Sequence, residues 1–460
     1  MHCLMNLSMI RNLFVWILIL AGVASSFGKN PPEFPTKISS NKRYLVDQNN
    51  IPFFIQSDTP WALFVGLTTE DAEIYLEDRR QKGFNSVTVN LIEHWFNRNK
   101  TAYPGSSYNQ YGQFPFMNFL SDSIPDFTTP NDKYFAHVDT IIHIALKKRI
   151  QVMMTPSYTG YINLKEGWYK EVVANGKERC REYGRYLGKR YADFPNIIWI
   201  MDGDRNPDSI SKPIIREMVA GIKEFDNKHL ITSHCHPSNS SRDHWEGDSW
   251  LDLNAVYTYN WMAYVHQRCL ENYQRIPVMP CFLFETAYEK EHRYTPAQIR
   301  AEMYWGWLCT IAGQQFGNGK IWMFADGWKD ELEAVGSWDQ LRLKKLVDSR
   351  DWPNLVPDYK HEVVTEGFGE KDNYVACAFT VNKETIIIYL PENATPIKVD
   401  MTKIGGKKAK CIWYNPQTGE SVLIGMFTTM GLKTFEKPDK NDWVLILEYN
   451  KTRNYGKNNC

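Results

Sequence analysis

Hydrophobic and polar residues between positions 44 and 352 follow two periods in turn. Short runs rich in β-branched and aromatic residues are each followed by a longer stretch with apolar residues at helical spacing. In one such stretch Thr68 stands at the N-cap, Asp71 stands at the capping-box position, and Gly83 ends the stretch. The pattern predicts strands at residues 52–58, 85–91, 150–156, 196–204, 229–236, 254–260, 278–285 and 320–324.

These strand–helix units predict an α/β fold, a (β/α)₈ TIM barrel over residues 44–352. An open, doubly wound sheet is the alternative, and it would gather its functional side chains at one switch point. Polar residues instead follow most of the predicted strands. That distribution favours the barrel, whose functional residues lie at the C-terminal ends of all its strands.

Residues 361–450 show a different pattern. Strand-like runs such as residues 384–391 and 443–449 are separated by turn signals, for example Gly405-Gly406. We therefore predict a small antiparallel β-sandwich that follows the barrel and is joined to it by residues 351–360.

Residues 1–26 have the organisation of a signal peptide. Arg11 supplies a positive charge, residues 13–24 are apolar, and the small residues Ala24-Ser25-Ser26 follow. The apolar run is short for a membrane span. We expect cleavage and export to the periplasm or the cell exterior, with no membrane contact afterwards; a retained signal anchor is the alternative. The Pro-rich residues 27–43 are expected to form a linker.

Composition narrows the class of partner. The 53 basic and 53 acidic residues cancel, which argues against nucleic acid or an anionic membrane as partner, because both select a basic excess. Aromatic residues make up 14% of the chain, and sugars stack on aromatic rings, so an oligosaccharide or polysaccharide is favoured. The nine cysteines lack a CxxC or metal-ligand spacing and predict buried free thiols. Nothing in the composition indicates an oligomeric state.

Two carboxylates carry the clearest chemistry. Asp204 ends the fourth predicted strand and Glu285 ends the seventh. Glycosidic cleavage needs one carboxyl group to protonate the leaving oxygen and a second to attack the anomeric carbon or activate water. Asp202 is an alternative acid or a loop cap. A buried Glu285 without a catalytic role would need an ion-pair partner, for which Arg293 or Arg300 is available.

A pair of histidines invites a metal interpretation. His234 and His236 lie on one face of the fifth predicted strand, but a catalytic zinc needs three protein ligands and no third is apparent. We therefore expect no metal and no cofactor. Asp58 is expected either to bind sugar or to cap a turn, and each aromatic ring either to stack on sugar or to pack in the core. The expected substrate-binding residues are Asp58, Trp61, Asn90, Glu93, Tyr158, Asp202, His234, His236, Tyr259 and Trp322, with Trp95 as a further stacking candidate.

Several segments taken together are similar to one known family. SDTPWALF (57–64), LTTEDAEIYLEDRRQKGFN (67–85), PNDKYFAHVD (130–139), YGRYLGKRYADFPNIIWIMDGD (183–204) and WPNLVPD (352–358) resemble the apiosidase-like glycoside hydrolases, family one hundred and forty. The region around YNPQTGE (414–420) resembles the collagen-binding-type sandwich that often accompanies that barrel. The resemblance extends over residues 44–449.

The resemblance implies an exported enzyme that attacks apiose-containing side chains of plant pectin. It places the family's catalytic Asp on Asp204 and its catalytic Glu on Glu285. We therefore predict a retaining glycoside hydrolase acting on pectic cell-wall glycan, with Asp204 as acid/base and Glu285 as nucleophile. Asp202-Gly203 stands where the family pattern has two glycines, and residues 157–160 replace its Trp-Gly.

Three alternatives to this function remain. They are a glycosidase of different sugar specificity, a non-catalytic carbohydrate-binding protein on a barrel scaffold, and a metal-dependent hydrolase that uses His234 and His236.

Overall fold

The computed structural model describes residues 33–93, 96, 108–161, 166–259 and 264–449. The expected signal peptide, residues 1–26, lies outside the described residues and stays a prediction. Trp95 lies outside them as well. In the described part of the chain, no helix is both long and apolar enough to cross a membrane.

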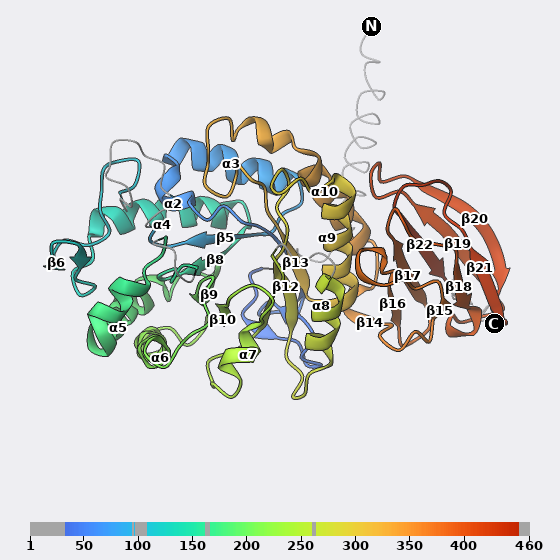
Figure 1. The fold of residues 1–460 in the computed structure, drawn as a ribbon, viewed down its shortest axis with the longest axis horizontal. Helices are drawn as coiled ribbons and strands as arrows, with labels where there is room; N and C mark the ends of the chain where they lie inside the picture. Colours follow the sequence, from blue (N-terminus) through green and yellow to red (C-terminus); the bar gives the residue numbers. More distant parts are fainter. Residues whose placement is uncertain (1–32, 94–95, 97–107, 162–165, 260–263, 450–460) are drawn as a thin grey trace, which may run out of the picture.

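Eight parallel strands form a ring (Figure 1). The strands follow one another around the ring in chain order, and the last one, β13, pairs with the first, β4. Only β10 and β11 lie side by side without a ladder between them. An open doubly wound sheet would leave its outer strands far apart, so the predicted TIM barrel is confirmed. The strands are β4 (Ile55–Asp58), β5 (Ser86–Asn90), β8 (Gln151–Thr155), β9 (Ile197–Asp202), β10 (Ile231–His234), β11 (Asn254–Tyr257), β12 (Cys281–Glu285) and β13 (Gly313–Phe316).

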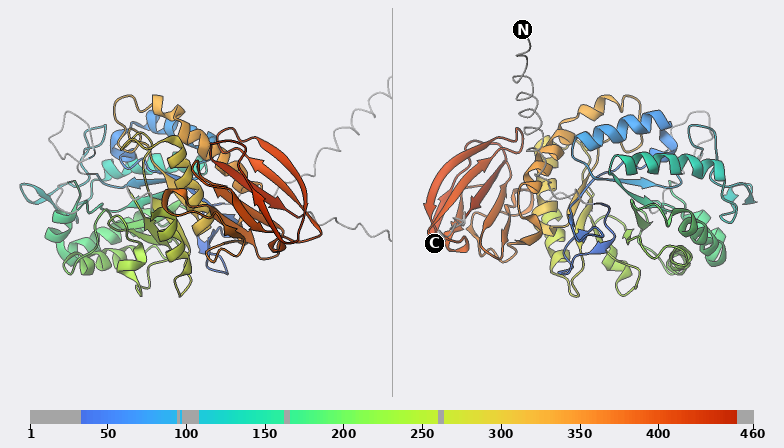
Figure 2. Two further views of the ribbon diagram at one scale, coloured as in Figure 1. Left: turned by 45° about the vertical axis from the view of Figure 1, so that its right-hand side comes forward. Right: turned by 180° about the vertical axis from the view of Figure 1, so that it is seen from behind.

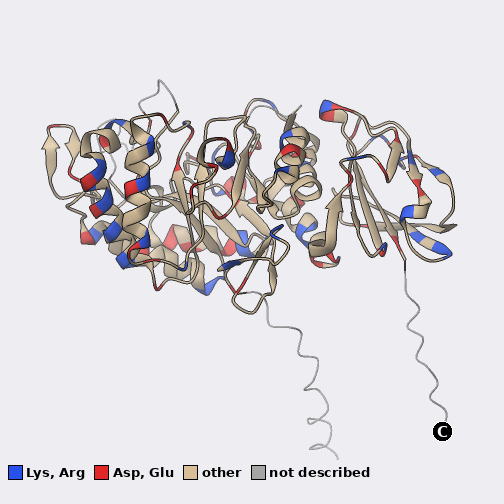
Figure 3. Ribbon diagram, turned by 90° about the horizontal axis from the view of Figure 1, so that it is seen from below, with Lys and Arg blue, Asp and Glu red and all other residues tan. Residues whose placement is uncertain are grey.

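Helices cover the outside of the ring, as the two views in Figure 2 show. As predicted, Thr68 caps the first long helix by accepting a hydrogen bond from the Asp71 backbone N–H. Acidic and basic residues are interspersed along this outer layer (Figure 3). The covering helices are α3 (Thr69–Gln81), α4 (Asp132–Lys147), α5 (Tyr169–Tyr191), α6 (Ser211–Lys223), α8 (Val265–Gln274), α9 (Pro296–Thr310) and α10 (Val335–Asp348), with the short α2 (Leu63–Gly66) and α7 (Ser241–Trp245) between them.

The eighth strand was predicted in the wrong place. Residues 320–324 are mostly apolar but form turns, whereas the strand is β13. Its glutamines conceal it in the sequence: Gln314 is fully buried and donates a 2.7 Å hydrogen bond to the Gln340 side chain. A polar strand can therefore be buried here because a helix supplies its partner.

The C-terminal domain consists of antiparallel strands, as predicted (Figure 2). One sheet has the order β14-β16-β17-β22-β19-β20 and the other β15-β18-β21, with an apolar core between them. The strands are β14 (Leu355–Pro357), β15 (Val364–Glu366), β16 (Ala376–Thr380), β17 (Thr385–Leu390), β18 (Ile397–Asp400), β19 (Lys408–Tyr414), β20 (Ser421–Thr428), β21 (Leu432–Phe435) and β22 (Trp443–Glu448). The edge strands β20 and β21, one in each sheet, were not predicted. Their residues are largely exposed and lack a strong alternation of buried and exposed positions.

Two small sheets complete the fold. Part of the expected linker 27–43 is folded, because β1 (Lys37–Ile38) pairs with β2 (Leu45–Val46), which pairs with β3 (Pro52–Phe53). A hairpin of β6 (Phe119–Ser121) and β7 (Ile124–Pro125) lies in the long loop before α4.

Helix α9 is buried between the barrel and the sandwich. Arg300 forms a two-pronged ion pair with Asp442 at 2.8 and 2.9 Å, and both side chains are almost completely buried. The Tyr304 ring stacks on Tyr389, with ring centroids 4.5 Å apart. The two domains therefore share one continuous interior.

Seven cysteines are described, and all are buried and unpaired, as predicted: Cys180, Cys235, Cys269, Cys281, Cys309, Cys377 and Cys411.

Candidate active site

A cavity of about 440 Å³ opens at the C-terminal ends of the barrel strands. Its walls combine aromatic rings with carboxylates and histidines, which is a surface suited to a polar ring-shaped ligand. The lining residues are Trp61, Phe96, Tyr158, Tyr161, Glu166, Asp204, His234, His236, Pro237, Tyr257, Tyr259, Glu285, Tyr288, Glu291 and Trp322.

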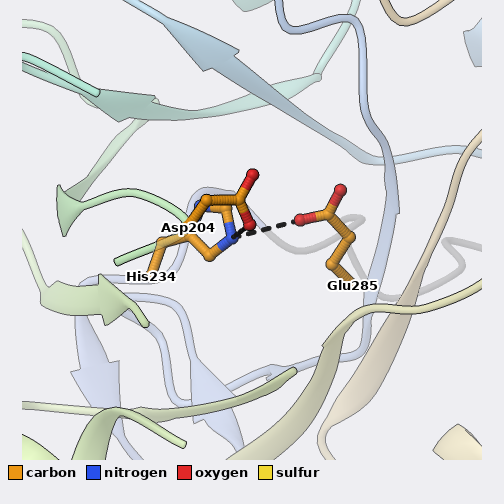
Figure 4. Close-up of side chains that lie close together, drawn as sticks. All are labelled: Asp204, His234 and Glu285. Atoms are coloured by element: carbon orange, nitrogen blue, oxygen red, sulfur yellow. Dashed lines mark ion pairs between the residues drawn. The ribbon is translucent and has the colours of Figure 1, made fainter. Parts of the chain in front are cut away.

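Asp204 and Glu285 face each other across this cavity with His234 between them (Figure 4). His234 Nε2 lies 3.4 Å from Asp204 Oδ1 and 3.2 Å from Glu285 Oε2. One carboxylate oxygen of Asp204 lies within 4.8 Å of one of Glu285. Two strands that are far apart in the sequence thus bring their terminal carboxylates to one place.

A tyrosine holds the remaining oxygen of each carboxylate. Tyr158 donates a 2.5 Å hydrogen bond to Asp204 Oδ2, and Tyr288 donates one of 2.5 Å to Glu285 Oε1. The indole N–H of Trp61 in turn donates to the Tyr288 oxygen at 2.8 Å. Both carboxylates are therefore oriented before any ligand enters.

The turn after β9 places Asp204. Asp202, Gly203 and Asp204 have φ angles of 65°, 155° and 49°, all in the left-handed half of conformational space. A Cβ atom on Gly203 would lie 2.1 Å from the Tyr158 ring, so only glycine fits there. Asp202 adopts a positive φ, which the glycine of the family pattern would adopt without steric strain.

The three central groups shift one another's pKa values. Burial raises the pKa of Glu285, and His234 only partly opposes this effect. Burial acts in the same direction on Asp204, but the nearby charge of His234 and the hydroxyls of Tyr158 and Tyr257 outweigh it and lower the pKa of that carboxyl. Burial would lower the pKa of His234, yet the two carboxylates raise it to about 9. The two carboxylates therefore favour the charged form of His234.

Two further carboxylates, Glu291 and Glu166, line the cavity. Glu291 accepts hydrogen bonds from the Tyr259 hydroxyl at 2.6 Å and from the Trp322 indole N–H at 2.8 Å. Glu166 accepts a hydrogen bond from the Tyr161 backbone N–H at 2.8 Å. These groups present oriented oxygens and flat rings, the two features that bind sugars.

Comparison with known families identifies the chain. Residues 39–354 match the family described as "Apiosidase-like, catalytic domain". The chain belongs to this family. The apiosidase-like barrel is therefore a glycoside hydrolase, and the predicted enzyme class and carbohydrate substrate are confirmed at this level. Residues 356–448 match a second family, described as "Putative collagen-binding domain of a collagenase".

Solved structures support the fold. A protein named glycoside hydrolase has 24% sequence identity and a TM-score of 0.77, with 90% of this chain and 97% of that chain covered. A glycoside hydrolase family 5 protein from Bacteroides vulgatus ATCC 8482 has 23% identity and a TM-score of 0.77, with 91% and 95% covered. No curated protein matches the sequence.

Eight of the predicted site residues line the cavity of the apiosidase-like barrel: Trp61, Tyr158, Asp204, His234, His236, Tyr259, Glu285 and Trp322.

Four predicted site residues do not line it. Asp58 is fully buried; it accepts a hydrogen bond from Tyr75 at 2.7 Å and pairs with Arg79 at 3.2 Å. It also accepts a hydrogen bond from the backbone N–H of Thr59, so its role is the structural alternative, a turn cap. The sequence could not reveal this because Arg79 lies on a helix surface that the barrel buries.

The other three residues, Asn90, Glu93 and Asp202, are also absent from the cavity lining. Asn90 donates a 2.6 Å hydrogen bond to Glu93, and both side chains are buried. Asp202 accepts hydrogen bonds from Ser233 and from the Trp245 indole N–H, and burial raises its pKa to about 7. Asp202 is thus a support of the turn, and the alternative of Asp202 as the acid is wrong because it does not reach the cavity.

The ion-pair alternative for Glu285 is also wrong, because among the described residues neither Arg293 nor Arg300 forms an ion pair with it. Arg300 pairs with Asp339 and Asp442 instead. Glu285 faces His234 and Tyr288 in the cavity.

Sequence reasoning missed several lining residues. Tyr257 ends β11 and was accessible to the strand-end rule that found Tyr259. Tyr288 and Glu291 lie beyond β12 in a loop, where nothing in the local pattern marks which side chain turns inward. The same is true of Glu166, Tyr161, Phe96 and Pro237.

The described residues contain one converging set of three potential metal-binding side chains, Asp204, His234 and Glu285. His236 is not part of it, so the histidine pair of the zinc interpretation does not form a site. His234 Nε2 already lies between two carboxylate oxygens at ion-pair distance.

Proposed function

We propose that this glycoside hydrolase cleaves O-glycosidic bonds with retention of configuration, using Asp204 as acid/base and Glu285 as nucleophile. The observation that supports this most is that both carboxylates meet in one cavity, with an oxygen of each within 4.8 Å. Retaining enzymes have carboxyl groups about 5–5.5 Å apart, whereas inverting enzymes need about 6.5–9.5 Å to admit a water.

The depths of the two carboxylates in the cavity suit these roles. Glu285 is the deeper one, with 8% of its side chain exposed against 20% for Asp204. A nucleophile must lie under the anomeric carbon, whereas an acid must reach the leaving oxygen and later admit water. In the first step Glu285 attacks the anomeric carbon while Asp204 protonates the leaving oxygen. In the second step Asp204 deprotonates a water that releases the sugar from Glu285.

The proposed substrate is a side chain of plant pectin that contains apiose, and the enzyme is proposed to be exported to reach it. Support comes from the family to which the catalytic domain belongs and from the signal-peptide pattern of residues 1–26. A panel of pectic oligosaccharides and synthetic glycosides tests the sugar. Cleavage of another glycoside in preference to apiosides would contradict this choice while leaving the mechanism intact.

The mechanism is tested with two variants. Glu285→Gln and Asp204→Asn should each lower kcat by at least ~10³-fold, because each removes a group that acts on the reacting bond. Circular dichroism should show an unchanged fold. Proton NMR of the first product should show the anomeric configuration of the substrate, and an inverted product would contradict retention.

The individual roles are tested with azide. With Asp204→Ala, azide should attack the glycosyl-enzyme and give a glycosyl azide of retained configuration. With Glu285→Ala, azide should replace the missing nucleophile and give the inverted azide. The opposite pattern would exchange the two roles.

Metal-dependent hydrolysis, the third alternative, predicts a different outcome. We expect full activity after dialysis against a chelator. Loss of activity that returns with zinc would replace the acid/base mechanism.

A further inference from the structure

The proposed reaction begins with a protonated acid, but the groups around Asp204 favour its charged form. Burial raises the pKa of Asp204, but the His234 ring 3.4 Å away and the hydroxyls of Tyr158 and Tyr257 together lower it. The proton required in the first step must therefore be stored elsewhere, within reach of Asp204.

We propose that His234 is the proton store of the catalytic pair and that it passes its Nε2 proton to Asp204 Oδ1 when substrate binds. This inference rests on the proposed function, because it concerns the proton used by its acid. It makes His234 a catalytic residue, since it contacts the reacting oxygens of both carboxylates.

The geometry suits a shared proton. Nε2 faces Asp204 Oδ1 and Glu285 Oε2 at 3.4 and 3.2 Å, both longer than the ~2.7–2.9 Å of a committed charge-assisted hydrogen bond. Neither contact is a well-formed hydrogen bond. The Nε2–H group therefore lies between two carboxylate acceptors without a full hydrogen bond to either. A small shift of one carboxylate determines which of them accepts the hydrogen bond.

The imidazole itself is held in place. His234 has 1% of its side chain exposed, and its ring stacks on Trp61 at 12° with centroids 5.4 Å apart. Phe284 and Tyr257 pack on it with centroids 4.8 Å away. The ring therefore cannot swing out to solvent, and its proton exchanges with the carboxylates.

The surrounding charges keep the proton on His234 before substrate arrives. In the part of the chain that the structure describes, no Lys or Arg lines the cavity. The two carboxylates raise the pKa of His234 to about 9 against the effect of burial. The titratable groups that face His234 are Asp204 after β9, Glu285 at the end of β12, Tyr257 at the end of β11 and Tyr158 after β8, with Asp202 behind them.

The step is balanced. The Nε2–H bond of the imidazolium breaks and an O–H bond forms on Asp204, which leaves a neutral imidazole and a neutral acid. A glycosyl group bound at Glu285 favours this transfer. As Glu285 attacks the anomeric carbon it loses its negative charge, and His234 then holds its proton less strongly. After water is deprotonated in the second step, Asp204 returns its proton to His234, so each turnover restores the store.

The test compares leaving groups at pH 7 through kcat/KM. For glycosides of the sugar found in the panel, His234→Gln should lose ~10²–10³-fold with an alkyl or sugar leaving group, within the range of acid catalysis. With dinitrophenol, which leaves without a proton, the loss should stay within ~10-fold. Asp204→Asn should show the same difference between the two kinds of leaving group. Glu285→Gln should lose activity with both kinds of leaving group. The control His236→Gln, also in the cavity, should show no difference between them. Equal losses for both leaving groups in His234→Gln would overturn the proposal.

A second measurement does not need activity. In protein with ¹⁵N-labelled histidine, the His234 signals, assigned by their absence from His234→Gln, should report an imidazolium at pH 7 that titrates near pH 9. Asp204→Asn and Glu285→Gln should each lower this pKa, since each removes a negative neighbour. Titration at or below 6.5 would overturn the proposal even if the enzyme were active. Failure of the wild type to cleave any glycoside would instead contradict the proposed function.

Discussion

Carboxylates at the ends of two barrel strands, β4 and β12, have different surroundings in this protein. Asp58 is paired with Arg79, and both side chains are 0% exposed, whereas Glu285 meets only tyrosine and histidine in a cavity. A buried carboxylate paired with arginine is satisfied and cannot act on a substrate. One whose partners are weaker keeps the reactivity that catalysis needs.

Breaking the Asp58–Arg79 pair should affect stability and leave chemistry alone. Asp58→Ala should lower the free energy of unfolding by about 3–5 kcal/mol, because it removes the fully buried counter-charge of Arg79 and leaves only the partly exposed Asp78 to pair with the guanidinium. Chemical denaturation measures the change. The control Arg80→Ala breaks a partly exposed pair with Glu77 and should cost less than about 1 kcal/mol. A large fall in kcat of an Asp58→Ala variant that remains folded would show that Asp58 has a role in the active site.

The turn between β9 and α6 shows how one element sets catalytic geometry. Its backbone bends through three residues of positive φ, and the ring of Tyr158 occupies the space beside Gly203. That ring then donates to Asp204. The conformation of the turn and the orientation of the acid are thus one structural feature.

Gly203→Ala should therefore reduce activity more than stability. The added methyl would displace the Tyr158 ring and with it Asp204, and a displacement of about 1 Å can cost ~10²-fold in kcat. The matched control is Gly247→Ala, which has φ of 86° but no atom within 4 Å of the new Cβ. This control carries the backbone strain of about 1–2 kcal/mol alone. Equal activity of the two variants would show that the ring contact does not position Asp204.

In the molecule as a whole, the sandwich completes the barrel's core. Helix α9 packs on β13 and β12 on one side and on β14 and β16 on the other. Its Arg300 is neutralised by Asp442 from the sandwich and Asp339 from α10. An arginine this deep requires its partner, so the two domains depend on each other for stability.

The full chain should consequently unfold in one calorimetric transition. Asp442→Ala should lower the stability of that single transition by about 3–5 kcal/mol, because it leaves Arg300 buried with half of its counter-charge. Glu362→Ala, which breaks an exposed pair with Lys403 inside the sandwich, should change it by less than about 1 kcal/mol. Two separate transitions, with only the later one shifted, would show independent domains.

Local pattern alone determined most of the fold and the centre of the site. Strand and helix periods, the Thr68 cap and the parallel barrel followed from the sequence, because these depend on neighbouring residues. Asp204 and Glu285 followed from the rule that parallel strands in a barrel end on one face, and the family resemblance assigned their roles.

Only the tertiary structure decided which polar side chains reach the cavity. Asp58 and Asp202 stand at strand ends like Glu285. However, Asp58 pairs with Arg79 and Asp202 accepts a hydrogen bond from Trp245, both from other elements of the fold. The polar strand β13 is stabilised by Gln340 of α10, which no local period reveals. The place of His234 between two carboxylates likewise depends on three strands meeting. Burial and long-range partners set these outcomes, and a linear pattern does not contain them.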